Sequence, residues 1–338
     1  MRRSIVVVAS ILLGSTALFG IGPKERPPRN LAILIFPGVQ IIDYTGPWEV
    51  FGHAFADDAP VFRIYTVAEK IEPITTAMGM SVNPAFTLAT APKPDVLVVP
   101  GGNVEPQLDN GAVIAWLRSS ARGAEVVLSV CNGAFFLAKA GLLDGLEATT
   151  FAGLIDELKA AAPKTRVVSD KRFVDNGKIV TAAGLSSGID GALHVIEKLC
   201  GKGTAQVAAL SLEYDWRPDS GYARASLADR HLRPAFAAMH GFSRSVLRHE
   251  GTRDRWETSW KVQTDAGAVF VLDRLDRAFG SATNWVRGRR GDSRGVATSA
   301  WSLRDSDGGR WVETTRVESV KEEKGYRVTV AVARAPTG

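Results

Sequence analysis

The sequence predicts an α/β domain with a doubly wound, mostly parallel sheet, followed by a small α+β domain at the C-terminus. Between residues 31 and 212, short apolar runs alternate with longer amphipathic stretches, the pattern of strands separated by helices. The run 31–36 is apolar throughout, as expected of a strand that is buried on both faces. After about residue 235 the runs become alternating and rich in tryptophan. We therefore expect the two domains to cover residues 30–230 and 240–338.

The first domain is expected to contain several buried strands joined by helices. Asn176-Gly177 is a strong hairpin turn signal between two short strands, and Gly141 is expected to end a helix. Pro47 suits the first turn of a helix. The predicted strands are 31–36, 62–68, 95–99, 125–130, 172–175 and 178–182, with an edge segment at 80–88. The predicted helices are 48–55, 112–121, 131–140, 154–162, 186–199 and 204–212.

The second domain is predicted from residues that alternate between apolar and polar. It holds five of the eight tryptophans of the chain, which we expect to pack in its core. Asp307-Gly308-Gly309 separates two of the alternating runs and predicts a hairpin turn. The predicted strands are 256–262, 300–304, 311–317 and 326–333, and a helix is predicted at 266–279.

The positive charge of the chain belongs to its C-terminal part. From residue 241 onward there are 18 Lys and Arg against 13 Asp and Glu, a difference of +5 that equals the net charge of the whole chain. Arg287, Arg289, Arg290 and Arg294 lie among glycines and are opposed only by Asp292. Such a group indicates either an anion-binding patch or a solvated arginine-rich loop. Because no nucleic-acid motif accompanies it, we favour the loop and expect no nucleic-acid partner.

The N-terminus has the pattern of an export signal. Arg2 and Arg3 precede a short apolar run, Ile5–Leu13, and Ser15-Thr16-Ala17 supplies small residues for cleavage. The run is too short to span a bilayer comfortably. We expect residues 1–25 to be a signal peptide and the protein to be periplasmic or secreted. The alternative is an uncleaved signal that anchors the chain to the membrane.

Cys131 has the setting of a nucleophile. It follows the apolar run 125–130 and opens a predicted helix, whose N–H groups and dipole favour a thiolate. Gly133 permits the sharp turn of a nucleophile elbow. We expect the amides of Asn132 and Gly133, together with those of Gly101 and Gly102, to bind an oxyanion or the substrate. From spacing alone, a buried structural cysteine remains an equal alternative.

A set of collinear motifs spans residues 31 to about 230. They are Ile35–Pro37, Asp43–Phe51, Val98–Gly102, Ser129–Gly133, Ala140–Gly145, Ala148–Thr150, Ser187–Leu193 and Leu212–Asp215. On these motifs the segment resembles the ThiJ/PfpI superfamily, which is related to class I glutamine amidotransferases. The branch of highest similarity contains the isonitrile hydratases, together with the amidotransferase-like sensor domains of AraC-type regulators. The resemblance implies a flavodoxin-like fold and usually a homodimer.

The resemblance implies a role for two side chains. In the hydratases a cysteine attacks the carbon of an isocyanide, and an aspartate of an Asp-x-x-Gly-Pro motif works beside it. Carried onto this chain, Cys131 is the nucleophile and Asp43 the acid and base, and water releases an N-substituted formamide. We expect burial to raise the pKa of Asp43. No cofactor and no metal is expected, because the sequence shows no metal-ligand cluster and no phosphate-binding glycine loop.

Two positions depart from the hydratase pattern. The hydratases have Thr after the cysteine and a His-Trp pair after the Ala-Thr-Thr stretch, where this chain has Asn132 and Phe151-Ala152. None of the five histidines stands at the position of an amidotransferase base, which disfavours a Cys-His-Glu hydrolase. Two alternatives to a hydratase therefore stay open: a sensor module that binds a small molecule without turnover, and a thiol-based stress protein.

Overall fold

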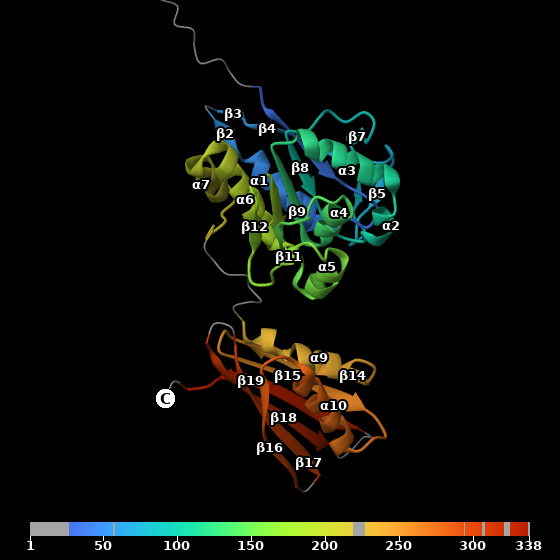
Figure 1. The fold of residues 1–338 in the computed structure, drawn as a ribbon, viewed down its shortest axis with the longest axis vertical. Helices are drawn as coiled ribbons and strands as arrows, with labels where there is room; N and C mark the ends of the chain where they lie inside the picture. The colour runs from blue at the N-terminus through green and yellow to red at the C-terminus, as the bar shows by residue number, and fades with distance from the viewer. Residues whose placement is uncertain are drawn as a thin grey trace, which may run out of the picture.

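The protein folds into two units, each with its own sheet and its own hydrophobic core (Figure 1). The computed structural model describes residues 27–336 apart from 57, 219–226, 294, 306–307 and 321–324. We call residues 27–218 the N-terminal unit and residues 227–336 the C-terminal unit. The predicted export signal, residues 1–25, lies outside the described residues.

The N-terminal unit is built on a seven-stranded sheet with the order β12-β13-β9-β8-β1-β4-β7. All neighbours are parallel except β12, which pairs antiparallel with β13 around the predicted Asn-Gly turn. The strand order reverses direction between β1 and β8, which makes this the switch point of a doubly wound sheet. The strands are β1 (Arg29–Leu34), β4 (Phe62–Ala68), β7 (Phe86–Thr87), β8 (Val96–Val99), β9 (Val126–Val130), β12 (Phe173–Asp175) and β13 (Ile179–Ala182).

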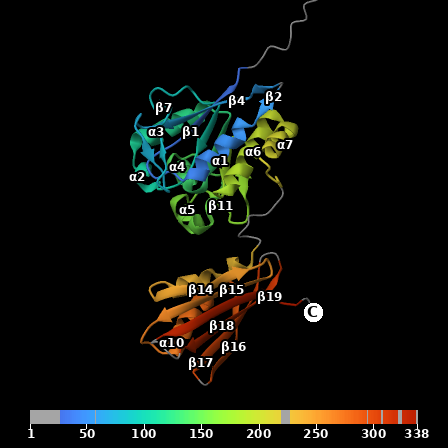
Figure 2. The same ribbon diagram turned by 180° about the vertical axis from the view of Figure 1, so that it is seen from behind.

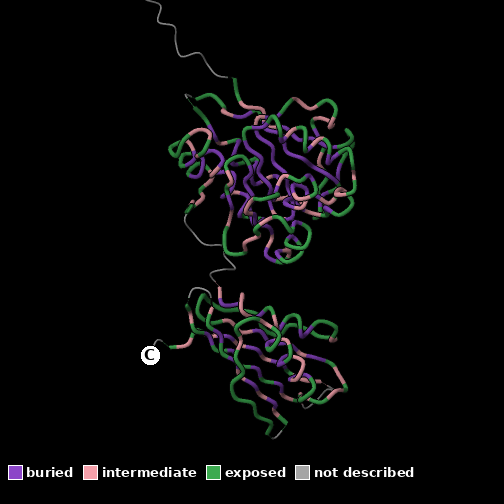
Figure 3. Tube along the Cα trace, in the orientation of Figure 1, coloured by how far each residue is buried: buried purple, intermediate pink, exposed green. Residues whose placement is uncertain are grey.

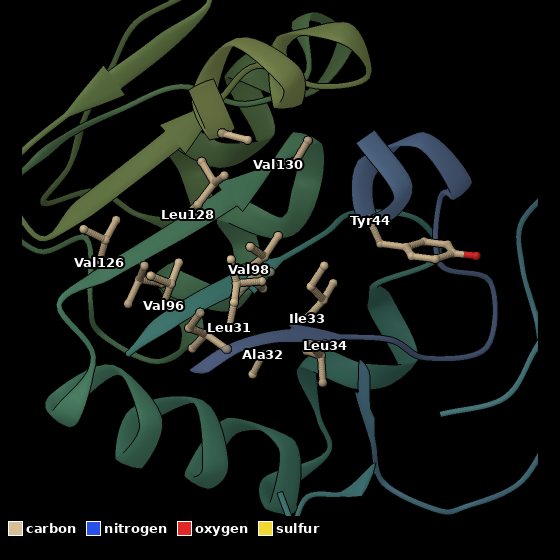
Figure 4. Packing of buried hydrophobic residues seen from close by; sticks show 14 of the residues in the cluster. Leu31, Ala32, Ile33, Leu34, Tyr44, Val96, Val98, Val126, Leu128 and Val130 are labelled. Atoms are coloured by element: carbon tan, nitrogen blue, oxygen red, sulfur yellow. The ribbon is translucent and has the colours of Figure 1, made fainter. Parts of the chain in front are cut away.

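The central strands are buried on both faces, as the apolar runs predict. Every residue of β8 and β9 is buried, and so are the last four residues of β1 (Figures 3 and 4). Leu31 and Ile33 of β1 are in register with Val96 and Val98 of β8, and Figure 4 shows these side chains packed along the neighbouring strands. A strand that packs on both faces must be covered by helices on both sides.

The helices form the two covering layers. Figures 1 and 2 show α1 and α6 on one face of the sheet and α3 and α4 on the other. The helices of this unit are α1 (Ile41–Gly52), α2 (Glu105–Leu108), α3 (Gly111–Gly123), α4 (Ala134–Lys139), α5 (Ile155–Ala161), α6 (Ser186–Cys200) and α7 (Lys202–Ser211). Short 3₁₀ turns precede two of them, η1 (Cys131–Gly133) and η2 (Ala152–Leu154). Two-residue strands complete the unit: β2 (Phe55–Ala56), β3 (Ala59–Pro60), β5 (Ile74–Thr75), β6 (Ser81–Val82), β10 (Glu147–Ala148) and β11 (Arg166–Val167).

Helix α1 begins earlier than its sequence predicts. It starts at Ile41, so Pro47 lies inside the helix and Asp43 in its first turn, whereas the prediction has Pro47 near the start. A proline inside a helix removes one backbone hydrogen bond. Here the same stretch buries Asp43, Tyr44 and Pro47 itself. The earlier start places Asp43 in the first turn of α1 and buries its side chain.

The C-terminal unit is a six-stranded antiparallel sheet with the order β14-β15-β19-β18-β17-β16, covered by helices. The four strands and the helix that the sequence predicts are all present within a few residues. The unit contains η3 (Ala228–Leu232), α9 (Arg233–Met239), β14 (Ser243–Gly251), β15 (Arg255–Gln263), α10 (Ala268–Ser281), β16 (Trp285–Ser293), β17 (Val296–Arg304), β18 (Arg310–Ser319) and β19 (Tyr326–Arg334).

The predicted arginine-rich loop is wrong, because Arg287, Arg289 and Arg290 lie in strand β16, while Arg294 is outside the described residues. This edge strand pairs with β17 through backbone hydrogen bonds, with a bulge between Arg287 and Arg290. Arg287 and Arg290 bind the carboxylate of Asp276 on α10. A strand that is exposed on both faces need not alternate in sequence, so its arginines carry no strand signal.

The second core begins before the predicted boundary. Ala228, Leu232 and Met239 are buried in the hydrophobic core of the C-terminal unit, so the segment 228–239 belongs to that core. Within the described part of the chain, no helix is both long and apolar enough to cross a membrane.

Glu313 is a fully buried carboxyl group of the C-terminal unit. It lies on the inner face of β18 with no solvent exposure, accepts a hydrogen bond from Thr315, and its Oε2 has no hydrogen-bond partner among the described residues. Burial, and to a smaller extent the nearby Asp276, raise the pKa of Glu313 from 4.5 to about 8. The folded unit therefore holds this group as the neutral acid at neutral pH.

The C-terminal unit should lose stability as pH rises from about 4.5 to about 8. In this window the unfolded chain has released the proton of Glu313 and the folded chain has not, so the free energy of unfolding falls by at most about 1.4 kcal/mol per pH unit. Urea unfolding followed by tryptophan fluorescence measures this slope. Glu313→Gln should flatten it, while Glu250→Gln, at an exposed position on β14, should not. An equal slope in Glu313→Gln would contradict the assignment.

Candidate active site

The candidate site lies where four neighbouring strands end. The segments after β1, β8, β9 and β13 meet at one edge of the sheet and carry Asp43, Gly101, Cys131 and Leu185. The loops after β1 and β8 are tied together, since the amide of Gln40 donates to the carbonyl of Gly101 at 2.9 Å. The site therefore occupies the switch-point crevice in which doubly wound folds bind ligands.

Asp43 is a carboxyl group with no solvent exposure that is held by backbone amides from two loops. The amide of Gly101 donates to its Oδ2 at 3.2 Å and the amide of Leu185 to its Oδ1 at 3.0 Å. The side chain also shares a hydrogen bond with Cys131. Burial raises the pKa of Asp43 from 3.8 to about 6, against the opposing effect of these hydrogen bonds. The predicted direction of this shift is confirmed.

Cys131 occupies a strained elbow at the end of β9. Its φ of 58° is in the left-handed region that a residue with a side chain rarely adopts. Its carbonyl accepts a hydrogen bond from the Thr150 hydroxyl at 2.8 Å, and the residue is half-buried. Strain of this kind persists only where the neighbours enforce it. The elbow geometry that the sequence predicts is present.

The surroundings of Cys131 oppose the thiolate that the predicted helix start favours. Burial, and then the negative charge of Asp43, raise the pKa of Cys131 from 9.0 to about 12, while the hydrogen bond from the Asn132 amide acts in the opposite direction. The helix dipole contributes little, because a 3₁₀ turn separates the cysteine from α4, which has only 6 residues. At neutral pH the proton therefore sits on sulfur and the carboxyl group of Asp43 is ionised, so the S–H group donates to the carboxylate.

Two of the four predicted oxyanion donors are occupied by the protein itself. The amide of Gly101 donates to Asp43, and the amide of Gly102 donates to Oδ1 of Asn132 at 2.8 Å. The Asn132 side chain returns a hydrogen bond from Nδ2 to the Gly102 carbonyl, also at 2.8 Å. Because a backbone amide has a single N–H, the amides of Gly101 and Gly102 hold the site together and are not free to bind a substrate. The backbone amide of Asn132 instead donates toward the sulfur of Cys131.

Gly133 is required by close packing. A Cβ atom at this position would stand 2.1 Å from the carbonyl oxygen of Val99, at the end of β8. No larger residue fits there without moving the strand. The glycine predicted from the elbow motif therefore allows the turn to lie directly against the neighbouring strand.

Sequence reasoning missed the segment that follows β13. Gly184 has a φ of 137°, and a Cβ atom built there would lie 3.2 Å from the sulfur of Cys131. Leu185, with a φ of 50°, supplies an amide to Asp43. Both follow directly on a predicted strand, so the rule that singled out Cys131 could have found them. The residue type, however, does not reveal which acceptor its backbone amide binds.

The histidines and the buried carboxyl group of Asp190 have other positions and partners. His53 caps α1, His194 hydrogen-bonds Asp175 at 2.8 Å, and the remaining three histidines belong to the C-terminal unit. Asp190 is buried in α6, where it pairs with Arg172 and accepts from Tyr214. The carboxyl group that is hydrogen-bonded to Cys131 is that of Asp43.

Gly184→Ala should slow alkylation of Cys131 by iodoacetamide and reduce the free energy of unfolding. The added methyl group meets the sulfur and adopts a φ that costs about 1–3 kcal/mol. Gly177→Ala is the matched control, because Gly177 also has a positive φ, 83°, but has open space around it. It should lose stability without a change in Cys131 reactivity. Equal effects of both substitutions would contradict the close contact.

Comparison with characterised proteins points to one family. The isonitrile hydratase of Pseudomonas putida is 37% identical over 198 residues, which cover 57% of this chain and 82% of that protein. The HTH-type transcriptional regulator CdhR of Pseudomonas aeruginosa is 29% identical over 60% of each chain. Protein DJ-1alpha of Drosophila melanogaster is 24% identical over 58% of this chain and 88% of its own.

Solved structures agree on the fold. A ThiJ/PfpI family protein from Pseudomonas syringae superposes with a TM-score of 0.54 at 29% identity, over 62% of this chain and 85% of that one. Drosophila melanogaster DJ-1beta superposes with a TM-score of 0.50 at 22% identity, over 56% of this chain and all of that one, which supports the fold alone. Residues 29–198 match the DJ-1/PfpI family, and the chain belongs to that family.

Proposed function

We propose that the protein is a cysteine-dependent hydratase that converts an isocyanide and water into an N-substituted formamide. The observation that carries the proposal is the pair formed by Cys131 and Asp43, in which a thiol faces an ionised carboxylate that is held by two backbone amides. The 37% identity to an isonitrile hydratase supports the same reaction.

The first step adds the thiol to the terminal carbon of the isocyanide. The sulfur of Cys131 forms a bond to that carbon, and Asp43 takes the thiol proton and returns it to the same carbon. The product is a thioimidate, in which the former isocyanide carbon carries one hydrogen and remains doubly bonded to nitrogen. Transfer of the proton during attack avoids a free thiolate, which this buried site disfavours.

The second step hydrolyses the thioimidate. Water attacks the carbon, one of its protons goes to nitrogen and the other returns through Asp43 to sulfur, and the carbon–sulfur bond breaks. The formamide leaves and the thiol of Cys131 is regenerated. Asp43 acts first as a base and then as an acid, so its carboxyl group must bind and release a proton near neutral pH, which its pKa of about 6 allows.

The reaction should depend on both side chains. Cys131→Ala should abolish formamide production from a simple alkyl isocyanide, and Asp43→Asn should reduce kcat by about 10²- to 10⁴-fold, because proton transfer is lost. Cys200→Ala and Glu49→Gln are the matched controls and should retain activity, since Cys200 lies at the end of α6 and Glu49 is exposed on the outer side of α1. Formamide is quantified by liquid chromatography, and an unchanged rate in Cys131→Ala would refute the proposal.

The pH dependence separates this mechanism from one that starts with a thiolate. Because Asp43 must be ionised to accept the thiol proton, kcat/KM should fall as pH drops through about 6. A rate that instead rises continuously toward the pKa of the cysteine, near 12, would favour a free thiolate. Saturable isocyanide binding without turnover would exclude the enzyme and favour a sensor module of the kind found in transcriptional regulators.

A further inference from the structure

The segment that supports the elbow of Cys131 is anchored at three points. The amide of Thr149 donates to the hydroxyl of Thr181 on β13 at 3.0 Å. The hydroxyl of Thr150 donates to the carbonyl of Cys131 at 2.8 Å. Two residues further on, the carbonyl of Ala152 accepts a hydrogen bond from Nη2 of Arg233 at 2.9 Å. The first two anchors come from the N-terminal unit, and the third comes from the C-terminal unit.

Arg233 is well placed to hold this segment. It is the first residue of α9, next to Leu232 and Ala235, which are buried in the core of the C-terminal unit. Figure 1 shows α9 on the side of its unit that faces α5. The positive charge of the Arg233 guanidinium also acts on Asp156, near the start of α5. The pKa of Asp156 is lowered mainly by Lys159 and to a smaller extent by Arg233. One arginine thus contacts a carbonyl and faces a carboxylate of the same loop and helix.

The mechanical consequence follows from the strain at Cys131. A positive φ at a residue with a side chain persists only if its surroundings hold it, and the Thr150 hydroxyl is one of the groups that do so. A single hydrogen bond joins Thr150 to the carbonyl of Cys131, so a change in the conformation of residues 150–152 also affects the conformation of the cysteine. Ala152 itself is buried, so its carbonyl depends on a protein donor when the two units are in contact.

We propose that the C-terminal unit controls the reactive cysteine by fixing the Thr150–Ala152 segment through Arg233, which acts as a positioning residue. When Arg233 binds the Ala152 carbonyl, the segment is held against the elbow and access to the sulfur is restricted. When the contact opens, the segment relaxes and the thiol becomes more accessible. This goes beyond the proposed hydration reaction and does not require it, because it concerns the exposure of the thiol alone.

The test compares the alkylation rates of the two cysteines in the full-length protein. Iodoacetamide labelling of Cys131 and Cys200 is followed by mass spectrometry, and Cys200 serves as the internal reference in the same unit. Arg233→Met keeps the aliphatic stem and removes the donor. It should raise the ratio of the Cys131 rate to the Cys200 rate by about 2- to 10-fold, the range set by one hydrogen bond. Arg233→Lys keeps a donor and should lie between Arg233→Met and the wild type.

Arg274→Met is the matched control. Arg274 donates to the carbonyl of His240 at 2.7 Å, the same type of bond, but entirely within the C-terminal unit. It should leave the rate ratio unchanged. A wild-type ratio in Arg233→Met, or the same rise in Arg274→Met, would overturn the proposal. Since the labelling needs no isocyanide, failure of the proposed hydratase activity and failure of this coupling are distinguished.

Discussion

The buried carboxylate of Asp43 is the constraint on which the rest of the site depends. A carboxylate without solvent needs donors, and here they come from the loops after β8 and β13 and from the thiol after β9. These strands neighbour one another in the sheet, so one side chain at the start of α1 joins four chain segments. In the proposed mechanism, the group that organises the site is also the group that exchanges the proton, so the elbow needs no histidine.

The sequence locates this site because strand ends are visible in apolar runs. Cys131, Asp43 and the Gly101-Gly102 turn all lie at the edge of the sheet that the runs predict. Their roles are harder to predict. The sequence predicts that the amides of Gly101 and Gly102 bind a ligand, whereas in the structure they donate to Asp43 and Asn132. Which N–H group is free depends on the orientation of each peptide plane, and the residue types that form a turn do not specify it. The contribution of Leu185 escapes sequence reasoning for the same reason.

In the C-terminal unit, too, the sequence predicts some strands and misses others. Strands β15, β17, β18 and β19 alternate because one face is buried, and the alternation predicts them within a few residues. It does not predict the edge strands β14 and β16, since most of their residues are exposed on both faces (Figure 3). Their structure comes from pairing with a neighbouring strand, which hydrophobic periodicity cannot reveal.

The position of the proton connects the geometry to a particular kind of substrate. Most cysteine nucleophiles attack as thiolates and leave protonation of the substrate to another group. In the proposed reaction, burial and Asp43 keep the proton on sulfur until attack, and the carboxylate that removes it stays beside the reacting atom. An isocyanide carbon accepts a nucleophile and a proton at the same atom. A sulfur and a carboxyl group in contact deliver both from adjacent positions, whereas a carbonyl substrate would need the proton at its oxygen or leaving group. The Cys131–Asp43 pair therefore suits addition at one carbon better than hydrolysis of an amide or ester.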